Sequence, residues 1–241
     1  MKPSPAEIAR TLVRGRLPGR LQLAGETAPT GLAHAADRAG RPLILVRDSD
    51  QPPPAGPATL TVVDVPPMPE APSLGRVLVE GSLHRLSNAA AAVAVHTFAE
   101  GNPVADLLDV GRGASLCRLT VTRVQLDRGS TTIDVDLADY AGAEPDPLHE
   151  YERDLLADLA GHHRYEVESY LRCLLALNGR APRVSPRPLR LDRYGFTVDV
   201  GEPGRYLRLS FLRPVHCRHE LAHLLRPVLF PSCADGPPPV R

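Results

Sequence analysis

The chain has 241 residues, which is enough for one large domain or two small ones with a substantial hydrophobic core. Its 28 basic and 28 acidic side chains give a formal net charge of zero. Because proteins that bind nucleic acid or anionic membranes usually carry a basic excess, we expect neither partner. The sequence shows no apolar run of membrane-spanning length and no signal-peptide pattern, which predicts a soluble, cytoplasmic protein.

The cysteines give little support to a metal or disulfide framework. Four are present, Cys117, Cys173, Cys217 and Cys233, and no two are close enough for a C-x-x-C motif. This spacing argues against a zinc ribbon and a redox dithiol, and four cysteines are few for a disulfide scaffold. Cys117 and Cys173 lie in apolar periodic segments, so we expect both thiols in the core.

Short elements follow one another through the first part of the chain. Helical spacing of apolar residues predicts a helix over 5–13, and an alanine-rich run predicts another over 88–100, with Asn88 as its N-cap. Strands are predicted at 20–24, 32–36, 43–46, 59–65, 76–86, 114–126 and 131–137. Many short strands separated by turn signals are typical of a small antiparallel barrel.

The pattern changes near residue 143. One long helix is predicted over 147–177, because apolar residues recur there at helical spacing. A hairpin of two strands, 189–200 and 206–212, follows, and a final helix over 216–225 ends before Pro227.

We therefore predict an α+β fold with two domains. Residues 1–142 form an N-terminal antiparallel split β-barrel, and residues 143–233 form a small helix–hairpin–helix domain. The proline-rich residues 234–241 are expected to be a disordered tail.

The order of these elements resembles a known family. Residues 139–148, 155–163, 189–196 and 207–215, placed after a six-stranded barrel, resemble the HugZ-like haem-utilisation proteins. Those proteins combine an FMN-binding split barrel of the pyridoxamine 5'-phosphate oxidase type with a C-terminal domain of unknown function. The resemblance implies a homodimer with a haem or flavin ligand near the dimer interface, and oxidative haem breakdown in some members.

Two departures from the family pattern affect the expected ligand. In flavin-binding relatives, the place of residues 47–54 holds the flavin phosphate, but here it contains two aspartates and three prolines. Carboxylates repel a phosphate and proline lacks an N–H donor, so we expect haem ahead of FMN. The family's His-Met-Asn-x-Asp-His run matches residues 158–163, where only the last histidine, His163, is kept.

The histidines near the C-terminus are the main candidate site. His216, His219 and His223 are spaced i, i+3 and i+7, which predicts a single stripe on the last helix. Imidazole is a common axial ligand of haem iron, and arginines such as Arg213 and Arg218 can pair with haem propionates. A solvated helix face that simply carries polar histidines is the alternative.

Residues 219–223 also match the H-E-x-x-H pattern of zinc proteases. That chemistry requires a third ligand downstream, and the remaining residues contain no histidine or glutamate. We therefore expect no catalytic metal here.

Three functions remain open at the level of sequence. The first is a haem-binding protein, with haem degradation as the activity if it is an enzyme. The second is a non-catalytic regulatory or scaffold protein, in which a barrel dimer and the C-terminal domain bind a protein partner. The third is a flavin-dependent oxidoreductase, which the visible absorption spectrum would distinguish from the other two.

Overall fold

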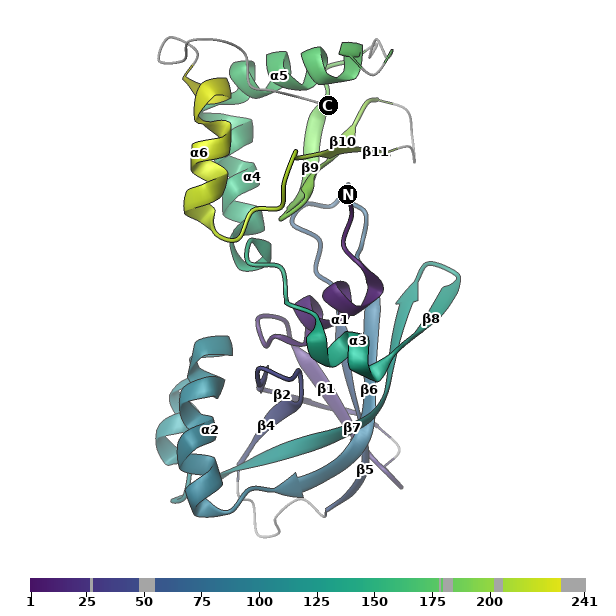
Figure 1. Cartoon of the computed structure of the whole chain (residues 1–241). Helices are drawn as coiled ribbons and strands as arrows, with labels where there is room; N and C mark the ends of the chain where they lie inside the picture. Colours follow the sequence, from purple (N-terminus) through teal and green to yellow (C-terminus); the bar gives the residue numbers. More distant parts are fainter. Residues whose placement is uncertain (27, 48–54, 178, 180–183, 202–205, 231–241) are drawn as a thin grey trace. The chain divides into compact units, whose positions relative to one another are not determined.

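The computed structural model describes residues 1–26, 28–47, 55–177, 179, 184–201 and 206–230. Within this part of the chain, two compact units are present (Figure 1). The barrel unit contains residues 4–65 and 73–145. The C-terminal unit contains residues 1–3, 66–72 and the chain from residue 146 onward. The flavin-phosphate segment after residue 47 and the predicted tail at 234–241 lie outside the described residues.

A curled antiparallel sheet forms the barrel unit, as the strand pattern predicts (Figure 1). Its strands are β1 (Gly19–Leu23), β2 (Thr30–Leu32), β3 (His34–Ala36), β4 (Pro42–Arg47), β5 (Gly56–Val63), β6 (Arg76–Arg85), β7 (Ala114–Arg128) and β8 (Thr131–Val135). They are ordered β2-β1-β5-β6-β7-β4-β3, with β8 paired to β7. The sheet is a half-barrel built around the long β6–β7 pair.

The alternation along β6 explains why this strand has one buried face. Val77, Val79 and Leu83 are buried against the barrel core, while the residues between them are more exposed. The register shifts at Gly81, where a Cβ atom would lie 2.1 Å from the Thr120 carbonyl oxygen. Only glycine fits this bulge, which allows the strand to bend.

Four helical segments accompany the sheet: α1 (Pro5–Val13), α2 (Asn88–Gly101), η1 (Ala105–Asp109) and α3 (Leu137–Gly142). The first two confirm the predicted helices. Ser4 and Glu7 form a capping box at α1, with hydrogen bonds of 3.2 and 2.7 Å. Ser87 rather than Asn88 caps α2, since its hydroxyl accepts a hydrogen bond from the Ala90 N–H. The two short segments η1 and α3 were not predicted.

The C-terminal unit differs from the predicted helix–hairpin–helix arrangement. Its elements are η2 (His149–Tyr151), α4 (Glu152–Gly161), α5 (Arg164–Leu177), β9 (Arg187–Asp192), β10 (Gly195–Asp199), β11 (Tyr206–Ser210) and α6 (Arg218–Leu229). The predicted long helix is broken between α4 and α5. The predicted first hairpin strand is two strands, so the sheet has three strands in the order β11-β10-β9.

The turn that splits the predicted strand has a clear local cause. Asp192 accepts a hydrogen bond of 2.8 Å from the Tyr194 N–H, which closes the turn. Gly195 has a φ of +143°, and a Cβ atom there would lie 2.1 Å from the Leu209 carbonyl oxygen. The turn therefore depends on glycine at this position.

Two further predictions about the C-terminal unit are wrong. Helix α6 continues to Leu229 and contains Pro227 instead of ending before it. Cys173 is exposed on α5, because its position lies outside the face that packs on the core, whereas Cys117 is buried as expected. Among the described residues, no helix combines the length and apolar character that a membrane crossing needs.

Candidate functional site: the histidine face of α6

His219 and His223 form a close pair on α6. They are one turn apart on the exposed side of the helix, and their Nε2 atoms are 2.9 Å apart. The rings meet edge to face, with centroids separated by 4.4 Å. In such a contact the Nε2–H of one ring donates a hydrogen bond to the lone pair on Nε2 of the other ring. The accepting ring is therefore a neutral imidazole. The predicted i, i+4 pair is therefore present and open to solvent.

His216 does not belong to this face. Helix α6 begins at Arg218 with Cys217 as its N-cap, so His216 precedes the helix and the predicted three-histidine stripe is broken. The Arg193 guanidinium donates a hydrogen bond of 3.1 Å to His216 Nδ1. Because arginine only donates, this contact places the proton of a neutral His216 ring on Nε2, where a lone pair would be needed to bind iron.

The start of α6 is held by its own acidic residue. Glu220 accepts a hydrogen bond of 2.8 Å from the His216 N–H, which lies just before the helix. This carboxylate therefore fixes the entry of the chain into α6. It is occupied in a backbone contact, unlike the general base of an H-E-x-x-H protease. In the described part of the chain, no group of three or more potential metal ligands occurs.

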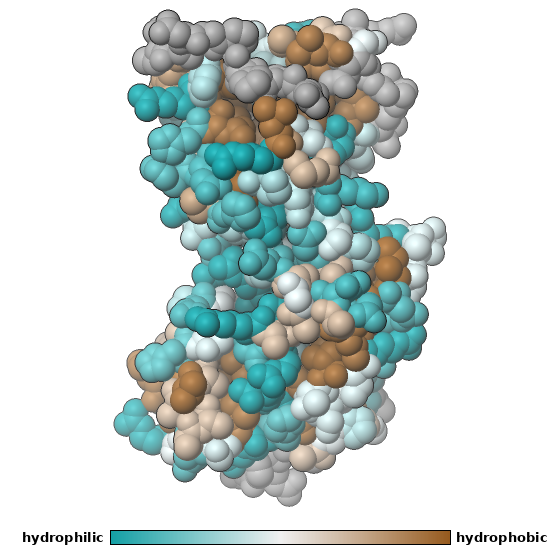
Figure 2. Space-filling model, viewed as in Figure 1, coloured by the Kyte–Doolittle hydropathy of each residue, from teal (hydrophilic) through white to brown (hydrophobic). Residues whose placement is uncertain are grey.

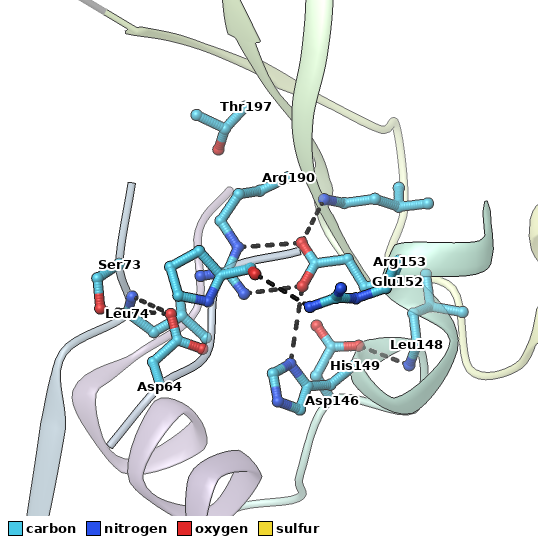
Figure 3. Close-up of polar contacts among 12 residues, drawn as sticks. Asp64, Ser73, Leu74, Asp146, Leu148, His149, Glu152, Arg153, Arg190 and Thr197 are labelled. Carbon is cyan, nitrogen blue, oxygen red and sulfur yellow. Dashed lines mark hydrogen bonds and ion pairs between the residues drawn. The ribbon is translucent and has the colours of Figure 1, made fainter. Parts of the chain in front are cut away.

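A buried ion pair supports the C-terminal unit (Figure 3). Glu152, at the start of α4, accepts two hydrogen bonds from Arg190 on β9, with lengths of 3.0 and 2.7 Å. It also accepts one of 2.8 Å from the Leu191 N–H. Burial alone would raise the pKa of Glu152, but hydrogen bonds from His149 and Arg190 and the Arg190 charge outweigh it and lower the pKa. The carboxylate is thus ionised and locks α4 to β9.

A second buried carboxylate fixes the turn that leads toward α6. Asp146 accepts hydrogen bonds from the Leu148 N–H at 2.8 Å and from the Arg193 N–H at 3.0 Å. Burial, together with the nearby Asp192 charge, raises the pKa of Asp146 to about 6, although both hydrogen bonds oppose the shift. Since Arg193 also contacts His216, this network positions the segment before α6.

His163 lies near the other end of α6. It sits between α4 and α5, and its ring packs edge-on against Phe230, with centroids 5.5 Å apart. Phe230 follows His219 by eleven residues, a distance of about 16 Å along a helix axis. His163 and His219 are therefore too far apart to bind one iron ion, so His163 and His219 are separate candidates.

The two predicted arginines have different surroundings. The Arg218 guanidinium lies 3.8 Å from the centre of the Tyr151 ring, in a cation–π contact. Arg213 is exposed in the segment that follows β11. Arg226, which was not predicted, is exposed one turn after His223 on the same side of α6. Arg213 and Arg226 are thus the guanidinium groups best placed to meet an anionic group outside the unit.

Sequence reasoning missed the buried network of Glu152, Arg190, Asp146 and Arg193. The partners are far apart in the chain, and charged residues in helices and strands normally indicate an exposed face. The one usable signal was the Asp192–Gly195 turn pattern, since Gly195 two residues after Arg193 marks a tight turn.

Comparisons with known proteins agree with this architecture. No known family model matches the chain, and no curated protein matches it. Among solved structures, a haem-binding protein from Mycobacterium smegmatis is similar, with a TM-score of 0.69 and 22% identity, over 97% of this chain and 99% of that chain. A protein of unknown function from Agrobacterium tumefaciens has a TM-score of 0.41 and 17% sequence identity, over 95% of this chain and 97% of that chain. ChuZ from Campylobacter jejuni has a TM-score of 0.42 and 11% sequence identity, over 58% of this chain and 62% of that chain.

The likeness to the Mycobacterium smegmatis protein, with a TM-score of 0.69, extends over both units. Because its identity to this chain is 22%, the likeness concerns the fold. The chain therefore has the fold of that haem-binding protein over nearly its whole length.

Proposed function

We propose that this protein binds haem, with an imidazole of α6 as the axial ligand. The observation that carries the proposal is the exposed His219–His223 pair, whose Nε2 atoms are 2.9 Å apart. Imidazole nitrogen is a natural donor for haem iron, and an exposed helix face leaves room for a macrocycle. The fold that this chain shares with the haem-binding protein from Mycobacterium smegmatis supports haem as the bound group.

His219 and His223 lie on the same helix, so one of the two imidazoles would hold the haem iron. The hydrogen bond between the two rings would have to open to free a ring nitrogen for this role. This geometry predicts that either histidine can replace the other in part.

Charged groups near the pair suit the anionic edge of haem. Arg226 lies on the same side of α6 and Arg213 is exposed before the helix, so both are candidates to pair with propionates. Arg218 is less suited, because it already packs on Tyr151. When bound, haem would supply redox or oxygen chemistry, while the chain would hold the macrocycle and select its ligand.

The proposal includes a homodimer. A haem on one exposed helix face would leave its other side open to solvent, and a second copy of the chain is the simplest cover. In that arrangement the ratio of haem to chain is one to one or one to two. A regulatory or scaffold role with a protein partner, and a flavin cofactor such as FMN, remain the alternatives that the same experiment distinguishes.

A haemin titration followed by visible absorbance tests the proposal. We expect a saturable shift of the Soret band for the wild type and for each single variant, His219→Ala and His223→Ala. The double variant should lose the shift. His162→Ala is the matched control, since this exposed histidine lies on the same unit, paired with Asp158 and not with α6.

The other outcomes are equally informative. A shift that survives in the double variant would contradict the α6 ligand and direct attention to His163. The absence of any shift in the wild type would reject haem. Flavin bands in the purified protein would then favour the oxidoreductase, and a colourless protein would favour the partner-binding role.

A further inference from the structure

The barrel unit contains a second candidate site, remote in sequence from α6. A cavity of about 490 Å³ lies between the first turns of α2, the short helix η1 and the first residues of β7. Pockets that take small molecules are usually about 300 to 1,000 Å³. The cavity is half-open, and its lining residues all belong to the barrel unit.

Small side chains create this space. Ala91 and Ala92 on α2, with Ala114 at the start of β7, line the cavity where larger residues would fill it. Gly111 also lines it, and a Cβ atom built there would meet no other atom within 4 Å. The alanine-rich start of α2 therefore leaves a hollow against the sheet, in place of the dense packing of an ordinary core. Leu86, Leu107 and Leu116 complete the buried apolar wall.

The outer wall of the cavity is held in place. Arg47 on β4 donates hydrogen bonds of 2.9 and 2.7 Å to the two oxygens of Asp106 on η1. Arg112 donates one of 2.8 Å to the Leu108 carbonyl oxygen. These contacts fix η1, so the cavity is formed before any ligand enters.

A large apolar side chain at the rim of the cavity is exposed to solvent. Leu108 lines the cavity, yet 76% of it is exposed to solvent. Figure 2 shows apolar atoms, in tan and brown, gathered over α2. A ligand with an aliphatic body would bury Leu108 together with the alanines.

The polar part of the lining selects the charge of the ligand. Arg85, Asn88 and Ser115 provide it, and among the described residues that line the cavity Arg85 is the one ionisable side chain. The first turn of α2 contains no acidic side chain, so the positive end of the helix is not neutralised there. The lining residues that the structure describes include no imidazole or sulfur donor for a metal, which separates this cavity from the proposed haem site.

We propose that this cavity binds a small amphipathic anion, with its carboxylate or phosphate group at Arg85 and its aliphatic body against the alanines of α2. The apolar wall, the single positive charge and the exposed Leu108 together favour this class over a neutral or cationic molecule. The site is independent of the proposed haem function, because it contains none of the α6 residues.

Binding of decanoate, measured by isothermal titration calorimetry, tests the proposal. We expect saturable binding that weakens about fourfold for each methylene removed, as in the step from decanoate to nonanoate. Ala92→Phe should abolish binding, since Ala92 is exposed and a large ring there fills the cavity without entering the core. Ala89→Phe is the matched control, because Ala89 is exposed on the same helix and does not line the cavity.

The charge is tested separately. Arg85→Gln should weaken decanoate binding about fivefold, in the range of an exposed charge contact, and should leave decanol binding unchanged. Arg20→Gln, which removes an exposed arginine on β1, should change neither. Leu108→Ser provides a second variant that reduces the apolar wall and should also weaken binding.

The outcomes separate this site from the haem proposal. Equal affinity of wild type and Ala92→Phe for decanoate, or no binding by the folded wild type, would overturn the proposal. The His219→Ala/His223→Ala variant should bind decanoate like the wild type. Loss of both haem binding and decanoate binding in that variant would contradict the independence of the two sites.

Discussion

The two units each contain a buried ionisable group that is accommodated in a different way. In the C-terminal unit, Glu152 and Arg190 are both buried and joined by two hydrogen bonds. In the barrel unit, the buried imidazole of His34 has no charged partner. His34 on β3 is fully buried, and neither ring nitrogen makes a hydrogen bond of normal geometry, although the Val13 carbonyl favours the charged ring slightly. Pairing keeps Glu152 and Arg190 charged, whereas burial without a charged partner favours the neutral ring of His34.

A separate set of contacts reaches the segment before α6, because Asp146 accepts from the Arg193 N–H and the Arg193 guanidinium contacts His216. In the barrel unit, the buried Arg10 donates instead to the backbone carbonyls of Ala143 and Arg38, at 3.1 and 2.7 Å. These contacts hold the loops at residues 38 and 143 against α1.

Breaking the Glu152–Arg190 ion pair should change the free energy of unfolding more than any other substitution proposed below. Glu152→Leu leaves the Arg190 guanidinium buried without its counterion, which should lower the free energy of unfolding of the C-terminal unit by about 3–5 kcal/mol. The double variant Glu152→Leu/Arg190→Met should lose less than Glu152→Leu alone. Denaturant unfolding of the full chain measures both. A loss below about 1 kcal/mol in the single variant would show that pairing matters little.

The unpaired histidine predicts a pH effect in the barrel unit. Burial lowers the pKa of His34 to about 4 from an ordinary value of 6.5. Between these values the unfolded chain binds a proton that the folded unit does not, so stability falls as the pH falls from 6.5 to 4, by about 3 kcal/mol. Amide hydrogen exchange of the barrel strands should report this loss. His34→Leu should remove it, and an unchanged pH profile in that variant would contradict the assignment.

Asp146 predicts an effect of opposite sign in the C-terminal unit. Its pKa is raised to about 6 from 3.8, so the folded unit retains a proton that the unfolded chain has released. The stability of this unit should therefore rise as the pH falls from 6 to 4, by up to about 3 kcal/mol. Hydrogen exchange resolved by unit is the required measurement, because the two effects cancel in a whole-chain transition. An Asp146 carboxyl that titrates near 4 in carbon NMR would refute this.

The smallest expected effects concern the two arginines. Arg218→Ala removes the cation–π contact with Tyr151 and should lower the free energy of unfolding by about 0.5–1 kcal/mol, with little change in haem affinity. Arg213→Ala should do the reverse, leaving stability unchanged and weakening haem binding a few-fold. Thermal unfolding and haemin titration of both variants provide the comparison. Equal haem affinity in the Arg213→Ala and Arg218→Ala variants would contradict the proposed contact between Arg213 and a haem propionate.

The barrel unit was the easier one to predict from sequence. Its strands alternate apolar and polar residues and are separated by strong turn signals, so the positions of β5, β6 and β7 follow from local pattern. The short segments η1 and α3 were missed because five or six residues give no periodicity. Ser87 replaced Asn88 as the cap of α2, a shift of one residue that falls within the usual uncertainty of helix ends.

The C-terminal unit shows where local pattern is insufficient. Apolar spacing continues from α4 into α5, so nothing periodic marks the break at His162 and His163. The His219–His223 pair could be predicted, since i, i+4 spacing on a helix is a local property. The place of His216 could not, because it depends on Arg193, a contact between residues far apart in the chain.

The proposal that a histidine of α6 holds haem is tested by an NMR spectrum of the histidine rings, recorded while haemin is added. Iron(III) broadens the signals of nuclei close to it, and rings farther away keep their signals. We expect the His219 and His223 signals to disappear together at saturation, while those of His162 and the barrel residue His96 remain. Persistence of both α6 signals alongside a saturated Soret shift would contradict it.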